Sequence, residues 1–187
     1  MTAQVTLVTP ATSWEAPSAV LGADGPLDEA GRKAAGEAGA PRADRTWCGP
    51  EVRCRETAEA LGVPGTAVAE LAGWDLGEWR GRTRADLAAE CPGDLEAWLT
   101  DPDAAPHGGE SLTGLLARTG RWLDTVPAGH TVAVTDQALV RAAVVSALSL
   151  PARSFWLLDA APLSATVLTA RDGQWHLRCG SPSGDGS

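Results

Sequence analysis

Hydrophobic and polar positions along this 187-residue chain follow two different periods. Short apolar runs at residues 4–9, 45–48 and 131–135 are typical of buried strands. Between them lie longer stretches in which apolar residues recur three or four positions apart, as in an amphipathic helix. The predicted helices cover residues 28–39, 50–61, 84–90, 94–99, 110–125 and 137–148. This alternation of element types predicts an α/β fold.

The C-terminal third of the chain adds a predicted hairpin and a tail. Residues 163–170 and 174–179 are predicted strands, and Asp172-Gly173 between them suits a tight turn. Residues 67–72 have the composition of an edge strand. Residues 181–187 are rich in Gly, Ser and Asp, so we expect one domain over residues 1–180 and a disordered tail over 181–187.

Composition narrows the class of protein. The chain is 44% hydrophobic and 21% charged, as in ordinary globular proteins, and its net charge of −9 disfavours nucleic acid and anionic membranes as partners. No apolar run is long enough to span a bilayer and no secretory leader is evident, so a cytoplasmic location is expected. The four cysteines show no Cys-x-x-Cys spacing, and we expect no cofactor.

Five segments, in order, resemble motifs of the histidine phosphatase (phosphoglycerate-mutase-like) superfamily. Residues 24–31, DGPLDEAG, resemble D-x-P-L-T-x-x-G, and residues 48–58, CGPEVRCRETA, resemble S-S-P-L-x-R-A-x-x-T-A. Residues 75–81 (DLGEWRG), 106–111 (PHGGES) and 131–141 (TVAVTDQALVR) resemble D-x-G-x-W-E-G, P-x-G-E-S and V-x-V-V-S-H-G-x-x-I-R. The resemblance covers most of the chain. It implies a single-domain, three-layer αβα fold with a mostly parallel central sheet.

The same resemblance implies which residues form the phosphate pocket, and most of them differ here. In that family the first strand ends in Arg-His-Gly and the His accepts the phosphoryl group, whereas this chain has Thr9 and Pro10 at those positions. The family's second His corresponds to Asp136, its usual acid corresponds to Gly73, and Arg53 alone is kept from the core set. Because phosphoryl transfer requires positive charge around the phosphate, these differences predict a divergent member without phosphohistidine chemistry.

Two interpretations remain open for each charged residue of the implied pocket. Asp136 precedes a predicted helix, so it can serve as an N-cap worth about 1 kcal/mol, and a capping carboxylate can still face a cleft. Arg53 can hold an anionic group of a ligand, or it can pair with Asp136 and plug the pocket.

Further candidates lie on loops. His107 is on a Pro/Gly-rich loop that the family places at the pocket mouth, where it is either solvated or functional. With Glu110 and Asp136 it could form a His/carboxylate metal site, but the spacing matches no ligand motif and no metal is predicted. Arg118 and Arg141 are expected on helix surfaces or behind the pocket. Among the tryptophans, those expected in the core are Trp47, Trp98, Trp122, Trp156 and Trp175, and those near pocket loops, which could form an aromatic wall, are Trp14, Trp74 and Trp79.

Two classes of function follow. The first is a catalytically degenerate protein that binds a small anionic or aromatic metabolite, or regulates a partner, with candidate ligand-binding residues Thr9, Arg53, His107, Glu110 and Asp136. The alternative is a non-phosphatase enzyme of specialised metabolism that uses Asp136, His107 or Glu110 as acid or base. Residual phosphatase activity through Cys48 or Thr9 is a third option. The sequence identifies neither the ligand nor the oligomeric state.

Overall fold

A six-stranded sheet forms the centre of the protein in a computed structural model, which describes residues 2–14, 20–39 and 42–179. The strand order is β3-β2-β4-β1-β5-β6. The strands are β1 (Ala3–Val8), β2 (Arg45–Cys48), β3 (Thr66–Ala67), β4 (Gly129–Val134), β5 (Ala165–Arg171) and β6 (Gln174–Arg178). Strands β1 to β4 pair in parallel, whereas β5 and β6 are antiparallel to their neighbours. The sheet is therefore mixed but mostly parallel, which confirms the predicted fold class.

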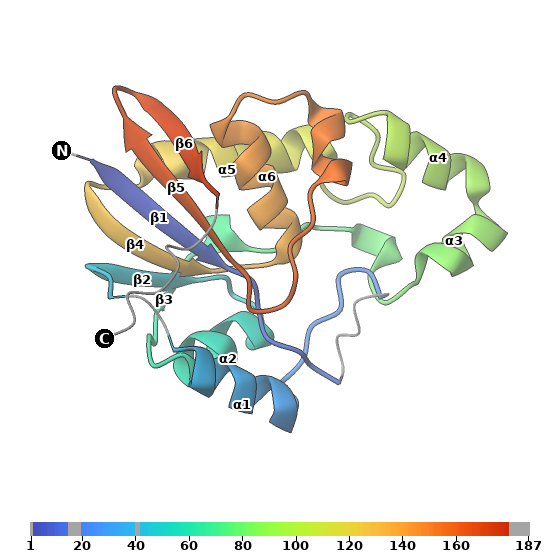
Figure 1. The fold of residues 1–187 in the computed structure, drawn as a ribbon. Helices are drawn as coiled ribbons and strands as arrows, with labels where there is room; N and C mark the ends of the chain where they lie inside the picture. Colours follow the sequence, from blue (N-terminus) through green and yellow to red (C-terminus); the bar gives the residue numbers. More distant parts are fainter. Residues whose placement is uncertain (1, 15–19, 40–41, 180–187) are drawn as a thin grey trace.

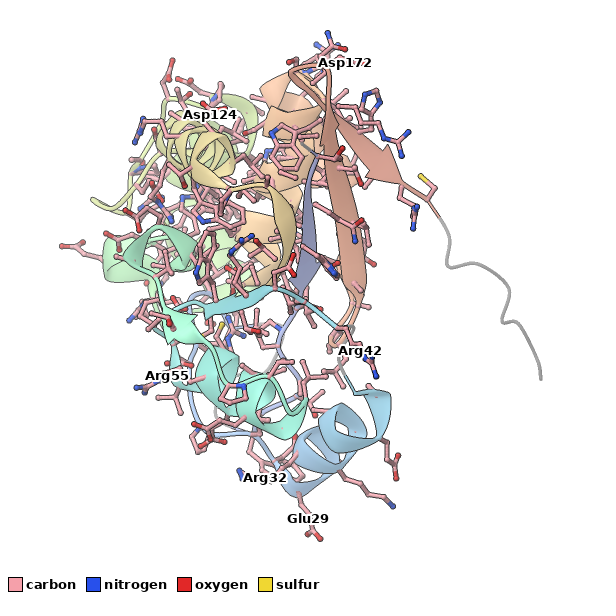
Figure 2. The ribbon with its side chains drawn as sticks, turned by 90° about the vertical axis from the view of Figure 1, so that its left-hand side faces the viewer. Glu29, Arg32, Arg42, Arg55, Asp124 and Asp172 are labelled. Carbon is pink, nitrogen blue, oxygen red and sulfur yellow. The ribbon has the colours of Figure 1, made fainter. Side chains whose placement is uncertain are left out.

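Helices cover both faces of this sheet, which gives three layers (Figure 1). Helices α1 (Glu29–Ala38) and α2 (Val52–Ala60) lie on one face, and α5 (Leu112–Thr125) and α6 (Gln137–Ala147) lie on the other. Helices α3 (Arg84–Glu90) and α4 (Pro92–Thr100) extend past the end of the sheet. Glu29 points outward from α1, as Figure 2 shows, whereas Arg32 of the same helix donates to Glu56 of α2 at 2.9 Å.

Side chains that alternate along the central strands supply a core on each face. Val5 and Leu7 of β1 are fully buried against Trp122 of α5. Val132 and Val134 of β4 point the other way and pack beneath α1 and α2. The period of two in a strand therefore separates the two cores, as the apolar runs of the sequence require.

A third core lies beyond the sheet and is dominated by aromatic rings. Trp74, Trp79 and Trp98 are buried there with Phe155, and Trp156 packs against the same group. Trp79 ends the short 3-10 helix η2 (Gly77–Trp79), while Phe155 and Trp156 belong to η3 (Ala152–Leu157). No periodic pattern along the chain predicts η3, because its six residues complete only two tight turns.

Most predicted elements are found within two residues of their expected ends, and two of them differ in detail. The second helix begins at Val52 rather than at residue 50, because Glu51 is still extended. Strand pairing in the predicted 67–72 edge strand stops at Ala67, and a 3-10 helix, Ala69–Leu71, follows. The predicted tail, 181–187, lies outside the described residues. Within the described residues, no helix combines the length and hydropathy needed to cross a membrane.

Candidate functional site

A cavity of about 510 Å³ opens where the carboxyl ends of the parallel strands meet the aromatic core. Ligand sites in open α/β sheets commonly occupy this edge. The charged side chains that line it are Arg53, Arg80, Arg84, Arg141, Glu51 and Asp136, and the aromatic ones are Trp74, Trp98, Phe155 and Trp156. Four arginines against two carboxylates make the lining basic, in a chain whose net charge is −9.

An ion pair between Arg53 and Asp136 forms part of the floor of this cavity. The Arg53 Nη2 donates to Asp136 Oδ2, and the two side chains are only 17% and 16% exposed. Asp136 also caps α6, because its Oδ1 accepts a 2.8 Å hydrogen bond from the amide of Ala138. Both expected roles of Asp136 are thus present at once. The pair does not plug the pocket, since the cavity remains above it.

Backbone contacts at the start of α2 hold Arg53 in this place. The Asp24 carboxylate accepts hydrogen bonds from the amides of Val52 and Arg53, at 2.9 and 3.1 Å. Charge of this kind at a helix N-terminus also offsets the positive end of the helix dipole. Asp24 belongs to the first matched motif, so its role is to position the second one.

Gly73 and Glu51 complete the floor. Glu51 Oε1 accepts a 2.7 Å hydrogen bond from the Gly73 amide, and its Oε2 is buried with no partner among the described residues. A Cβ at Gly73 would lie 3.3 Å from Asp136 Cβ, so a larger side chain here would press on the ion pair. Glu51, Arg53, Gly73 and Asp136 form the floor cluster of the cavity. This cluster holds two carboxylates and one guanidinium.

The register of the sheet places the ends of β1 and β4 side by side. Val8 pairs with Val134, and the amide of Thr135 donates to the Val8 carbonyl at 3.0 Å. Pro10 and Asp136, each two residues further on, therefore occupy corresponding positions at the carboxyl edge. Pro10 is buried, and it does not contribute to the lining of the cavity.

Thr9, a candidate ligand-binding residue, does not line this cavity either. Its side chain is fully buried and its hydroxyl donates to the Ala161 carbonyl at 2.5 Å. The same oxygen accepts from the amide of Ser164 at 2.9 Å. These bonds direct the hydroxyl toward the segment that precedes β5.

His107 is buried rather than placed at the mouth of the pocket, so that expectation is wrong. Only 1% of the residue is exposed, and its ring packs edge-on against Trp74, Trp79 and Trp98. Its Nδ1 accepts a 3.0 Å hydrogen bond from the Gly109 amide, which requires a neutral ring. Burial, opposed only by the Asp75 charge, lowers the pKa of His107 below its usual 6.5.

Glu110 likewise turns away from the cavity, because Arg118 holds both of its carboxylate oxygens. The Arg118 Nε and Nη2 donate to Oε1 and Oε2 at 3.0 and 2.8 Å. Nη1 of the same arginine donates to the Glu70 and Ala72 carbonyls. Arg118 therefore ties α5 to the segment before Trp74, which agrees with its expected place behind the pocket.

His107, Glu110 and Asp136 thus lie in three separate contacts, and the described residues contain no cluster of metal-ligating side chains. The alternative nucleophile Cys48 does not line the cavity: it is 1% exposed and directs its thiol at the Gly65 carbonyl. Burial, more than any nearby charge, raises the pKa of this thiol and keeps it protonated.

Arg84 and Arg141 are cavity residues that the sequence did not indicate. The Arg84 guanidinium lies over the rings of Trp98 and Trp156, at 5.6 and 5.4 Å, and Arg141 lies over Phe155 at 5.9 Å. Arg141 was expected outside the site. Its spacing of four from Gln137 on α6 is the signal that could have placed it, because both residues line the cavity.

The aromatic wall also differs from expectation. Trp98 and Trp156 line the cavity although they were expected only in the core, and Trp74 lines it as expected. Trp79 is 5% exposed and faces the third core instead. Trp14 is 83% exposed and makes no part of the lining. Helical or strand spacing did not separate these roles, because most of these rings lie in loops and short 3-10 helices.

Among the known proteins of similar sequence, two that are named phosphatases match over short segments. One is glucosyl-3-phosphoglycerate phosphatase of Mycobacterium tuberculosis, which is 48% identical over 44 residues, or 24% of this chain and 20% of that protein. The enzyme of the same name from Mycolicibacterium vanbaalenii is 38% identical over 71 residues, or 36% of this chain and 32% of that protein. The matched segments thus span about a third or less of the length of these relatives.

Solved structures match over nearly the whole chain. The alpha-ribazole phosphatase from Shigella flexneri superimposes with a TM-score of 0.81 at 20% identity, over 94% of each chain. A mycobacterial glucosyl-3-phosphoglycerate phosphatase in complex with VO3 gives a TM-score of 0.78 at 25% identity, over 97% of this chain and all of that one. The sequence profile of the histidine phosphatase superfamily (branch 1) matches residues 11–180. This chain therefore belongs to the histidine phosphatase superfamily.

Proposed function

We propose that this protein binds a small organic anion in the cavity and does not transfer phosphoryl groups through a histidine. The observation that carries the proposal is the Arg53–Asp136 ion pair. A guanidinium already paired with a carboxylate adds little net charge to attract a phosphate dianion.

The rest of the floor cluster supports the same conclusion. The Glu51 carboxylate lies next to Gly73 and adds a second negative charge, so the floor carries one positive and two negative side chains. Phosphoryl transfer needs the opposite balance, because charge on the transferring oxygens must be neutralised. A phosphate placed against this floor would meet carboxylate oxygens rather than hydrogen-bond donors.

Pro10, two residues after the end of β1, also supports the proposal, because it stands where the family has its nucleophilic histidine. Pro10 has no side-chain atom that can attack phosphorus, and it stands opposite Asp136 in the register of the sheet. His107, the histidine of the matched motif at residues 106–111, is buried with its ring among tryptophans. We therefore infer that no group among the described residues can form phosphohistidine at this edge of the sheet.

Phosphatase activity is the second candidate, because both named relatives and both structural neighbours are called phosphatases. Their names specify phosphate esters of small organic molecules, and a pocket for such molecules would suit binding as well as hydrolysis. A non-phosphatase enzyme using Asp136, His107 and Glu110 has less support, since these three side chains lie in separate contacts.

One experiment separates binding from turnover. The purified protein is incubated with p-nitrophenyl phosphate and with glucosyl-3-phosphoglycerate, and hydrolysis is measured. A parallel reaction with a labelled phosphoryl donor is quenched rapidly to trap any phosphohistidine. We expect no acid-labile phosphoprotein and no hydrolysis above that of Arg53→Ala. Native mass spectrometry of protein purified without phosphate is expected to show a retained anion. Hydrolysis that Arg53→Ala abolishes would overturn the proposal.

A further inference from the structure

Arg84 and Arg141 form a pair of cations on one aromatic wall, outside the floor cluster. The Trp98 and Trp156 rings contact edge-to-face, with centroids 4.9 Å apart, and Phe155 contacts Trp156 at 5.0 Å. Arg84 lies over Trp98 and Trp156, and Arg141 lies over Phe155. The rings therefore fix both guanidinium groups and leave the N–H donors at their edges available.

Neither arginine has a carboxylate that neutralises it among the described residues. No ion pair of Arg84 occurs there, and the one partner of Arg141 is Asp159 at 3.8 Å. Asp159 is 96% exposed, and its Oδ1 is occupied by the Ala160 amide at 2.8 Å, so it offers Arg141 little. The Nε of Arg141 is buried and has no hydrogen-bond partner in the described part of the chain.

The two cations are also close enough to repel one another. Partial desolvation, followed by the charge of Arg141, lowers the pKa of Arg84 from its usual value. Two like charges held together without a counter-charge are destabilising, and an anion between them would remove that cost.

The space beside the pair is amphipathic. A second hollow of about 500 Å³ shares Arg84, Arg141 and Trp156 with the main cavity. Its other walls are Leu99, Leu157, Leu158 and the exposed carboxylate of Asp159, and Leu157 is 83% exposed. The pair thus lies where a basic cavity meets a groove that presents three leucines beside its charged residues.

From this arrangement we infer that Arg84 and Arg141 hold the oxyanion of the ligand, and that its apolar part lies along Leu157 and Trp156. The inference rests on the proposed function, which it makes specific. The ligand class is a small amphipathic oxyanion, either a carboxylate or a phosphate monoester, attached to an apolar or aromatic group. Arg53, which the family resemblance singles out, does not hold the anion, because Asp136 already occupies it.

Titration of the full chain with defined probes tests this inference. Benzoate and phenyl phosphate represent the two oxyanions, benzamide is the uncharged counterpart of benzoate, and inorganic phosphate lacks the apolar part. The readout is the ¹⁵N–¹H signal of the arginine Nε groups, with intrinsic tryptophan fluorescence as a second measure. We expect both aromatic anions to shift the Arg84 and Arg141 signals, and benzamide to leave them unchanged.

Variants then assign the contacts. Arg84 is an exposed residue, so Arg84→Gln should fold normally, and it is expected to weaken both aromatic anions about tenfold, as is Arg141→Gln. Leu157→Ser should weaken benzoate and phenyl phosphate but not inorganic phosphate. Arg153 lies on the same 3-10 helix as Leu157 but lines neither hollow, so Arg153→Gln is the matched control. This variant should bind the probes as the unmodified protein does.

The outcomes distinguish this inference from the proposed function. If the anions bind but only Arg53→Gln weakens them, the anion lies at the floor, so the inference fails while the proposed function stands. If no probe binds at 10 mM, the inference also fails. If phenyl phosphate is instead hydrolysed through phosphohistidine, the proposed function fails, and the benzoate titration still decides where an anion binds.

Discussion

The guanidinium of Arg53 and the carboxylate of Asp136 form an ion pair between the first turn of α2 and the N-cap of α6. The two residues are 83 positions apart in the chain and meet because β2 and β4 are neighbouring parallel strands. Their pairing joins two helices that lie on opposite faces of the sheet. It also determines the charge that a ligand meets at the cavity floor.

Replacing Asp136 by Asn should free the Arg53 charge while an oxygen remains to cap α6. We expect affinity for inorganic phosphate to increase several-fold, because the floor loses a negative charge. The free energy of unfolding should fall by about 1–3 kcal/mol, since a partly buried guanidinium loses its partner. Isothermal titration and chemical denaturation measure the two effects. Asp159→Asn, at a 96% exposed carboxylate, is the control and should leave the stability unchanged.

His107 should make the protein less stable in mild acid. Its pKa in the folded state lies below the usual 6.5, so the unfolded chain takes up a proton at a higher pH than the folded chain does. The free energy of unfolding therefore decreases as pH falls below about 6.5, until the folded state also binds the proton. Denaturation between pH 8 and pH 5 should show a smaller loss in His107→Gln than in the unmodified protein. Equal losses in both would rule out this source of pH dependence.

Gly77 should tolerate no side chain. Its φ of +45° is left-handed, and an added Cβ would lie 2.9 Å from the Gly109 amide nitrogen and against the His107 carbonyl. We expect Gly77→Ala to destabilise the fold by roughly 2 kcal/mol or more. Gly93 is the matched control, because a Cβ there meets nothing within 4 Å and the residue lies in α4. Gly93→Ala should raise stability by about 0.5–1 kcal/mol in the same thermal unfolding series.

Trp98 should be the most costly tryptophan to truncate. It is 2% exposed and contacts the rings of Trp74, Trp79 and Trp156. Trp98→Ala is expected to cost about 3–5 kcal/mol. Trp98→Phe should cost less, since the buried Nε1 has no hydrogen-bond partner in the described chain and its loss removes no bond. Urea denaturation measures both variants, and Trp14→Ala, at an 83% exposed position, should change stability by less than about 0.5 kcal/mol.

The sequence by itself determined the types of most elements and the α/β class, because the periods of two and near four act locally and need no knowledge of partners. The three-layer arrangement was implied by the resemblance to the histidine phosphatase superfamily. The sequence predicted β1, α1, α5 and α6 to within two residues, and the Asp172-Gly173 turn, where both residues adopt positive φ. It also named Asp136 as a helix cap and as a possible partner of Arg53, and both contacts are present.

Tertiary structure alone decided which candidates reach the cavity. Thr9, His107 and Glu110 are each turned away by local bonds to the Ala161 carbonyl, the Gly109 amide and Arg118, which no spacing along the chain reveals. Arg84 and Arg141 come together because α3, α6 and the 3-10 helix of Phe155 and Trp156 pack around one group of rings. Side-chain convergence depends on packing between distant elements, whereas the elements themselves depend on patterns within ten or so neighbouring residues.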